Sequence, residues 1–309
     1  YQGVNKIFES FKKNKKVRRY VLPSGDRVKG GGFTHLMVIL NDKKLPNIPE
    51  HLQRVPIVVN PRDCVPKDYI RNNIKENLQL IPKNKFITKY RNHGDHAIIV
   101  SGGHSTDFNK VKEVLNENPN TLLMCVKHAY PHLLKNGIKP WGCIVLDPRS
   151  IDGESTHGIK RKDLFKTIEP STKFFIATMT DPSVTNYLMK RKADIWGWNA
   201  FTESLRDDAD RKQGIQNNQV KIRDDIGLPK GATLITGGTC AAMRAIGMLH
   251  TMGFRTVNLF GFDCNLEEEP TEEMKKETTG AEDEDPRPKY FQVSIEKDPF
   301  WTTGELLAM

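Results

Sequence analysis

Beyond about residue 93 the sequence alternates between short apolar runs and segments with helical periodicity. The apolar runs have the length of β-strands and lie at residues 97–100, 122–126, 143–146, 174–177, 193–196, 233–235 and 257–260. Helical patterns fall between them at 106–116, 129–136, 183–191 and 240–252. A strand that is apolar at successive positions is buried on both faces, which is typical of a parallel sheet covered by helices. The pattern predicts an α/β fold with a Rossmann-like, mostly parallel sheet and helices on both faces.

The remaining parts of the chain lack this alternation. Residues 1–92 read as an irregular N-terminal extension or small subdomain, with a strand at 34–40. Because proline recurs there, we expect no long helix in this region; the prolines are Pro46, Pro49, Pro56, Pro61 and Pro66. The nucleotide-binding core is predicted to span 93–265. Residues 266–309 are expected to form an acidic surface loop at 267–285, a returning edge strand at 290–294 and the start of a helix at 303–309.

Hydropathy and cysteine content limit the classes of protein to which this chain can belong. No stretch approaches the roughly 20 uninterrupted apolar residues of a membrane helix, and the N-terminus lacks the apolar core of a signal peptide. The five cysteines are odd in number and widely spaced, as reduced thiols are; they are Cys64, Cys125, Cys143, Cys240 and Cys264. Cys125 and His128 form one Cys-x-x-His without a second half-site, which does not favour zinc. We expect a soluble, cytoplasmic protein without a membrane partner.

The net charge of +9 is unevenly distributed along the chain. Residues 265–285 carry ten Asp/Glu and two Lys, a charge of −8, which leaves +17 on the rest. A basic body suits a ligand that bears phosphate or another anionic group, although an ordinary soluble surface is the alternative explanation. The chain shows no zinc finger, aromatic RNA-binding signature or basic zipper, so a nucleic-acid partner is not expected. The sequence does not predict an oligomeric state.

Two glycine-rich turns follow predicted strands. Gly102-Gly103 and Ser105 come after the strand at 97–100, and Gly237-Gly238-Thr239 comes after the strand at 233–235. Glycine lets backbone N–H groups approach an anion, and a helix N-terminus adds partial positive charge. Ser105 stands at an N-cap position, from which it could cap its helix or donate to a phosphate. Both turns are candidates for binding a nucleotide or phosphate, with close packing of helix on sheet as the alternative for each.

Charged residues follow the other strands. Asp147 and Arg149 come after the strand at 143–146, and Asp263 follows the strand at 257–260. The two acids could hold Mg²⁺ between phosphate oxygens or position a ribose hydroxyl. The alternatives are that Asp147 caps a turn before Pro148 or pairs with Arg149, and that Asp263 is an ordinary loop acid. Because ligands collect at the carboxyl ends of parallel strands, we expect the acids and the glycine turns to meet in one crevice. The candidates for phosphate contact or acid–base catalysis are Lys127, Arg149, His104 and His128.

Three segments, taken in order, resemble the archaeal 6-hydroxymethylpterin diphosphokinase-like domain. That domain is shared with motility accessory factors that modify flagellin, and its core is similar to that of bacterial CMP-sialic-acid sialyltransferases. Residues 97–105 look like the family's strand followed by Gly-x-Gly-Pro-Ser. Residues 133–148 are similar to its "leucine, glycine-isoleucine-x-proline, strand, aspartate" segment, and residues 237–263 to its Gly-Gly-Ser/Thr helix with a following Gly-x-Asp. Ser101 replaces the first glycine of the family pattern, and His104 replaces its proline.

The resemblance implies a nucleotide-dependent transferase. One branch of the family is a Mg²⁺- and ATP-dependent diphosphokinase that acts on a pterin alcohol, in which the cation neutralises the triphosphate. The other branch looks like a glycosyltransferase that uses a CMP-activated sugar and manages without metal, by a general acid or base and phosphate donors. We therefore expect diphosphokinase-type phosphoryl transfer. The alternatives are CMP-sugar-dependent glycosyl transfer to a small-molecule or glycan acceptor, and a non-catalytic nucleotide-binding protein.

Overall fold

The fold was obtained as a computed structural model. It describes residues 17–21, 37–40, 65–154, 159–201, 225–237, 240–263, 265–266, 268–276, 290–295 and 298–303. The chain divides into two compact units, one formed by residues 1–57 with 209–216 and the other by residues 58–208 with 217–309. In the first unit β1 (Val17–Val21) pairs with β2 (Met37–Leu40) in an antiparallel hairpin. The strand expected at 34–40 is thus confirmed over its last four residues.

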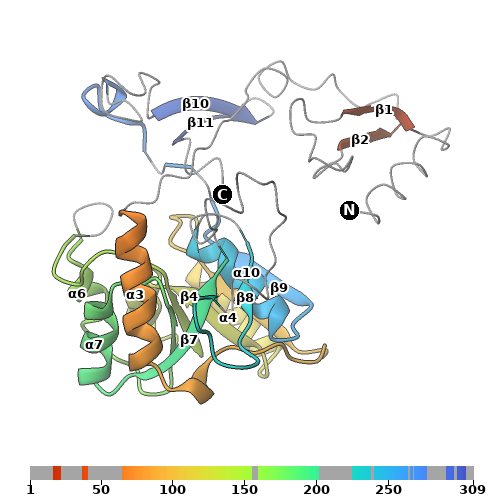
Figure 1. The fold of residues 1–309 in the computed structure, drawn as a ribbon. Coiled ribbons are helices and arrows are strands. Elements are labelled where there is room, and N and C mark those ends of the chain that lie inside the picture. The colour runs from red at the N-terminus through yellow and green to blue at the C-terminus, as the bar shows by residue number, and fades with distance from the viewer. Residues whose placement is uncertain are drawn as a thin grey trace. The chain divides into compact units, whose positions relative to one another are not determined.

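The second unit contains a seven-stranded parallel sheet (Figure 1). Its strands lie in the order β8-β7-β6-β5-β4-β3-β9, and every neighbouring pair is parallel. In chain order the strands are β3 (His96–Val100), β4 (Leu122–Val126), β5 (Gly142–Val145), β6 (Lys173–Ala177), β7 (Asp194–Ala200), β8 (Leu234–Ile235) and β9 (Thr256–Phe260). Each of them coincides with a predicted apolar run, so the α/β prediction is confirmed.

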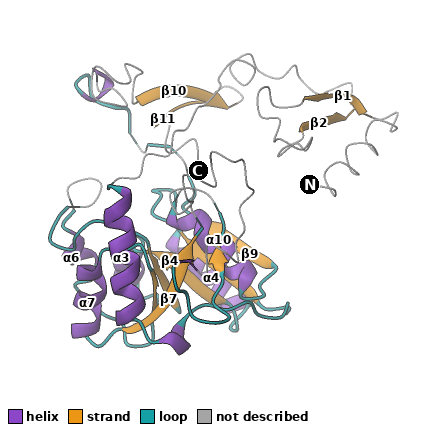
Figure 2. Ribbon diagram, viewed as in Figure 1, coloured by secondary structure: helices purple, strands orange, loops and turns teal. Residues whose placement is uncertain are grey.

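Helices connect the strands and cover the sheet (Figure 2). They are α3 (Lys67–Leu80), α4 (Phe108–Glu117), α5 (Tyr130–Lys135), α6 (Arg161–Leu164), α7 (Pro182–Lys190) and α10 (Ala241–Thr251), with 3₁₀ turns η1 (Lys83–Lys85) and η4 (Met274–Lys276). Helices α3 and α7 pack against each other. Helix α10 contacts β8 at one edge of the sheet, β5 at its middle, and β4 and β3 on the other side of the middle. A single helix reaches these strands because the sheet curls around it.

The core lies between the central strands and the helices. Strands β3 to β6 are almost wholly buried, and aromatic rings fill the space beside them. Tyr130 lies edge-on to Phe174 with ring centroids 5.3 Å apart, and its hydroxyl accepts the N–H of Glu169 at 2.8 Å. Burial raises the pKa of Tyr130 to about 12. The tyrosine is therefore a core residue whose single polar atom is satisfied.

Helix α3 corrects the expectation that no long helix precedes residue 93. The prolines on which that expectation rested end at Pro66, which stands at the N-cap, and the helix of 14 residues begins directly after it. Its buried positions, Ile70, Asn73, Ile74 and Asn77, recur every three or four residues and form one face. That face contains two asparagines, which obscures the apolar periodicity in the sequence.

The C-terminal segment forms a sheet of its own. β10 (Tyr290–Ile295) pairs with β11 (Asp298–Thr303) in antiparallel register. The returning strand expected at 290–294 is confirmed as a strand, but it pairs with β11 instead of extending the main sheet. Thr303, expected to begin a helix, ends β11; residues 304–309 lie outside the described part, as do residues 267 and 277–285 of the acidic segment. In the described residues no helix is long and apolar enough to cross a membrane.

Candidate functional site

Four adjacent strands bring most of the predicted site residues to one edge of the sheet. β9, β3, β4 and β5 are neighbours and parallel, so the turns that follow them lie side by side at their carboxyl ends. Asp263 follows β9, Gly102 to Ser105 follow β3, Lys127 and His128 follow β4, and Asp147 to Arg149 follow β5. The turn after β3 abuts the turn after β4, because a Cβ built on Gly102 would lie 3.3 Å from the Cβ of His128.

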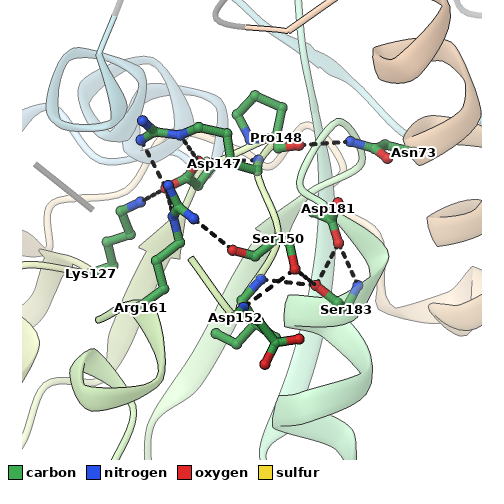
Figure 3. Close-up of polar contacts among 11 residues, drawn as sticks. Asn73, Lys127, Asp147, Pro148, Ser150, Asp152, Arg161, Asp181 and Ser183 are labelled. Atoms are coloured by element: carbon green, nitrogen blue, oxygen red, sulfur yellow. Dashed lines mark hydrogen bonds and ion pairs between the residues drawn. The ribbon is translucent and has the colours of Figure 1, made fainter. Parts of the chain in front are cut away.

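Asp147 is the centre of a cluster of three cations (Figure 3). Its carboxylate is only 2% exposed and pairs with Lys127 Nζ through Oδ2. Arg149 Nε donates to Oδ1 at 2.8 Å, and Arg161 Nε donates to Oδ2 at 3.1 Å. Lys127 and Arg161 are themselves buried, whereas the side chain of Arg149 is 41% exposed. Three cationic side chains thus converge on one carboxylate, and Arg149 is the member of the cluster most accessible to solvent.

The electrostatics of the cluster follow from burial and charge together. Burial alone raises the pKa of Asp147, but the hydrogen bond from Arg149 and the charge of Lys127 outweigh it, so the pKa lies well below its usual range. Burial lowers the pKa of Lys127, and the opposing attraction of Asp147 offsets this only in part. The ionised carboxylate of Asp147 thus stabilises the buried charges of Lys127 and Arg161.

Arg161 belongs to this cluster although its position in the sequence gives no sign of it. It opens the four-residue helix α6, and its Nη1 donates to the carbonyl of Ser150 at 2.7 Å. A Cβ on Gly153 would lie 2.5 Å from the same Nη1, so only glycine leaves room for the guanidinium there. Arg161 follows no apolar strand and lies in a segment rich in lysine and arginine. No spacing or motif distinguishes it from its neighbours.

Helix α3 holds the loop that carries Asp147. Asn73 Nδ2 donates to the carbonyls of Pro148 at 3.2 Å and Met179 at 3.1 Å, as Figure 3 shows for Pro148. Asp181 caps α7 by accepting the N–H of Ser183 at 2.9 Å, which confirms the predicted helix start, and the Ser183 hydroxyl accepts the N–H of Ile151 at 3.0 Å. The loop after β5 is therefore fixed on both sides.

The glycine turn after β3 is closed by Asp263. The N–H of Ser105 donates to Asp263 Oδ2 at 2.8 Å, and its hydroxyl donates to Oδ1. His104 Nδ1 lies 3.3 Å from the same Oδ2. A Cβ on Gly103 would clash with Asp263 Oδ2 and the carbonyl of Gly261, so glycine is needed for the close approach of the β9 turn. Asp107, rather than Ser105, is the N-cap of α4, which corrects that expectation.

The second glycine turn lies at the opposite end of the sheet order. It follows β8, which β7, β6, β5 and β4 separate from β3. Gly237 has φ of +150°, and a Cβ there would lie 3.0 Å from the carbonyl of Met243. Gly238 and Thr239 lie outside the described residues.

Neither predicted metal ligand presents a free carboxylate oxygen. Those of Asp147 accept from three cationic side chains, and those of Asp263 accept from Ser105 and lie beside His104. Within the part of the chain that the structure describes, no group of three or more His, Cys, Asp or Glu side chains could hold a metal ion. As arranged, the two acids do not fit a shared Mg²⁺, and their assignment as its ligands stays a prediction.

Comparison with known protein families adds to this geometry. The family described as 6-hydroxymethylpterin diphosphokinase MptE-like matches residues 69–269, more than half of the chain. The chain belongs to this family. The match begins within α3 and extends past Asp263, so it includes every strand of the parallel sheet and both clusters of the candidate site. Membership of this family supports a transferase activity.

One solved structure is similar to part of this chain. The structure of the MAf glycosyltransferase from Magnetospirillum magneticum AMB-1 superposes with a TM-score of 0.48 and 13% sequence identity, over 78% of this chain. The matched part is 33% of that protein, so this chain spans about a third of its length. No curated protein matches the sequence of the chain.

Proposed function

We propose that this chain is a nucleotide-dependent transferase of the diphosphokinase type. The observation that carries the proposal is the cluster of Lys127, Arg149 and Arg161 around one buried carboxylate, at the sheet edge where α/β folds bind ligands. Family membership favours the same class of reaction. Three cationic side chains close together suit the phosphates of a nucleoside triphosphate and the charge that moves onto the leaving phosphate.

In this reaction an acceptor hydroxyl attacks the β-phosphorus of the triphosphate. The new bond joins the acceptor oxygen to that phosphorus, the bond between the β-phosphorus and the oxygen that bridges it to the α-phosphorus breaks, and nucleoside monophosphate leaves with that oxygen and the electron pair, so that the β- and γ-phosphates pass to the acceptor together. Arg149 contacts the phosphates, because it alone of the three cations is substantially exposed. Lys127 and Arg161 pair with Asp147, which fixes their positions, and their positive charges attract the phosphates that Arg149 contacts. When it accompanies the nucleotide, Mg²⁺ arrives as part of the substrate.

The proton of the acceptor hydroxyl requires a base. His104 is 30% exposed, and its Nδ1 faces Asp263, which directs Nε2 away from the carboxylate. A carboxylate on one ring nitrogen fixes the orientation of the imidazole. We assign the proton to His104 Nε2, with Asp263 as the residue that orients it.

The same pair favours a second candidate, which is glycosyl transfer from a CMP-sugar. That reaction needs a base for the acceptor and donors for the departing nucleotide phosphate, and it needs no metal. His104 with Asp263 would be the base, and Arg149 the phosphate donor. The two reactions differ in the nucleotide that the site accepts.

Calorimetric titration followed by a turnover assay separates the candidates. ATP binding that requires Mg²⁺, with release of AMP, supports the diphosphokinase; CMP binding without metal, with release of CMP from a CMP-sugar, supports the glycosyltransferase. Binding of either nucleotide without turnover indicates a non-catalytic protein. If Asp147→Asn and Asp263→Asn both leave the affinity for Mg·ATP and the turnover unchanged, the assignment of these acids as metal ligands is wrong.

A pair of adjacent variants tests the cation cluster itself. Arg161→Gln removes a buried cation that contacts Asp147, whereas Lys162→Gln removes an exposed lysine that pairs with the exposed Asp152. We expect Arg161→Gln to weaken nucleotide binding about tenfold or more and Lys162→Gln to leave it unchanged. Equal affinities in the two variants would contradict the placement of the phosphates at this cluster.

A further inference from the structure

Tyr69 is an exposed aromatic residue whose hydroxyl is held by a buried carboxylate. It lies in the first turn of α3 and is 41% exposed. Its hydroxyl donates to Asp181 Oδ2 at 2.5 Å, and Asp181 is only 6% exposed. This hydrogen bond raises the pKa of Tyr69, so the hydroxyl keeps its proton and remains a donor to the carboxylate. An aromatic ring that is open to solvent is therefore held in place.

The carboxylate that holds the ring is itself fixed. Asp181 Oδ1 accepts the N–H of Ser183 at 2.9 Å and the hydroxyl of Ser183 at 2.5 Å. The backbone N–H of Asp181 donates to the carbonyl of Asp147 at 3.0 Å, and Figure 3 shows Asp181 beside the loop that carries Asp147. A side chain that is held in place before a ligand arrives loses little conformational entropy when the ligand covers it. Tyr69 thus offers a preorganised aromatic surface.

Tyr69 lies at the same edge of the sheet as the cation cluster. Asp181 belongs to the turn after β6, and the neighbouring turn after β5 carries Arg149. Asn73, one helical turn beyond Tyr69, donates to the carbonyl of Pro148 in that neighbouring turn. The exposed ring and the exposed guanidinium of Arg149 are therefore presented by adjacent turns.

We propose that the nucleobase of the bound nucleotide stacks on the ring of Tyr69. A nucleotide joins its base to its phosphates through one sugar, so a ligand whose phosphates contact Arg149 can extend its base over the neighbouring turn. Stacking on an aromatic side chain tolerates any base, because every base has a π-face. The inference applies to ATP and to a CMP-sugar alike, and it rests on the proposed use of a nucleotide. It assigns Tyr69 to binding and not to the bond-breaking step.

The test compares each nucleotide with a counterpart that lacks the base. Calorimetric titration of the full chain measures the dissociation constants of ATP and tripolyphosphate, both with Mg²⁺, and those of CMP and ribose phosphate. We expect Tyr69→Leu to weaken the binding of the nucleotide about tenfold and to leave that of the base-free counterpart unchanged. Tyr69→Phe keeps the ring and should lose less. Tyr90→Leu is the matched control, because Tyr90 is 67% exposed but precedes β3, on the side where the strands begin.

The outcomes separate this inference from the proposed function. If the unsubstituted chain binds neither the nucleotides nor their base-free counterparts, the proposed function is wrong and the inference falls with it. If a nucleotide binds and Tyr69→Leu binds it equally well, the inference alone is overturned. Equal losses for the nucleotide and its base-free counterpart would mean that Tyr69 only supports the turn, and equal losses in Tyr69→Phe and Tyr69→Leu would exclude a role of the ring; either result overturns the inference.

A second measurement uses the unsubstituted protein, in case Tyr69→Leu does not fold. An ATP analogue that carries an azide on its base is bound and irradiated, and the chain is then digested with trypsin. Cleavage after Lys67 and Arg71 releases the short peptide that contains Tyr69. We expect this peptide to carry the label and excess ATP to suppress it. Specific labelling that is confined to other peptides overturns the inference.

Discussion

Replacing Asp147 by Asn removes the single negative charge on which three cations converge. The substitution keeps the shape of the side chain, so the effect reports on charge and hydrogen bonding rather than on volume. Asn retains one acceptor oxygen, but its amide group turns two donor hydrogens toward cations that are themselves donors. Lys127 and Arg161, both buried, lose their partner, while Arg149 can turn toward solvent.

The magnitude follows from the burial of the groups left behind. Breaking a buried ion pair by removal of one partner costs about 3 to 5 kcal/mol, because an uncompensated charge remains inside. Arg149 adds little to this sum, since its side chain is 41% exposed and water replaces the lost contact. We therefore expect the free energy of unfolding to fall by about 3 to 5 kcal/mol, a large share of the roughly 5 to 15 kcal/mol that native proteins possess.

Equilibrium unfolding in urea, followed by tryptophan fluorescence and far-ultraviolet circular dichroism, measures this change. The matched control is Asp152→Asn, which breaks the exposed pair with Lys162 and should leave the transition where it is. A shift of less than about 1 kcal/mol in Asp147→Asn, with an unchanged dependence on urea, would refute the claim that Asp147 anchors the cluster.

The same reasoning predicts a pH dependence. The pKa of Asp147 is lowered in the folded state, so its stabilising contribution is complete above the unfolded value of about 3.9 and is lost as the pH falls below it. The difference in stability between the unsubstituted protein and Asp147→Asn should stay constant from pH 7 to about 5 and shrink below about 4. A difference that grows in acid would reverse the sign and contradict the ionised carboxylate.

Three further outcomes are expected. Asn77→Ala should lower the free energy of unfolding by about 3 kcal/mol in the same urea assay, because its amide bridges two buried carbonyls at 2.9 and 2.6 Å. Gly103→Ala should lower the melting temperature by pushing Asp263 out of the turn, whereas Gly94→Ala, which meets no atom within 4 Å, should not. Tyr130→Phe should remove a loss of stability between about pH 10 and 12, since this tyrosine ionises near pH 10 in the unfolded chain, whereas its pKa in the folded protein is about 12.

The strands were predictable from the sequence because a strand that is buried on both faces consists of consecutive apolar residues. Ile98, Ile99 and Val100, for example, are fully buried, and an amphipathic helix does not bury three successive side chains in this way. Their order in the sheet was not predictable, because β9 pairs with β3 through contacts that no local pattern encodes. The alternative that Asp147 pairs with Arg149 is confirmed, and the sequence could not choose between that pair and a metal because both place an acid at a strand end.

The residues that sequence reasoning missed share a physical reason. Arg161 acts through burial, and burial of a single arginine depends on tertiary contacts rather than on its neighbours in the chain. Asn73 and Asn77 lie on the inner face of α3, where polar side chains weaken the periodicity that marks a helix. Asn73 and Asn77 donate to backbone carbonyls in the turns after β5 and β6, and these turns come together only after the sheet has formed.

β9 is the last strand of the parallel sheet in chain order, and the orientation of the candidate base, His104, depends on it. The five strands from β4 to β8 each pair with the strand synthesised just before, so the strands from β3 to β8 can assemble progressively from short-range contacts. β9 must instead return to β3, about 160 residues earlier in the chain. Only then does Asp263 reach His104 and Ser105. A nascent chain that has not released residue 263 from the ribosome therefore has a nearly finished sheet and an imidazole that nothing orients.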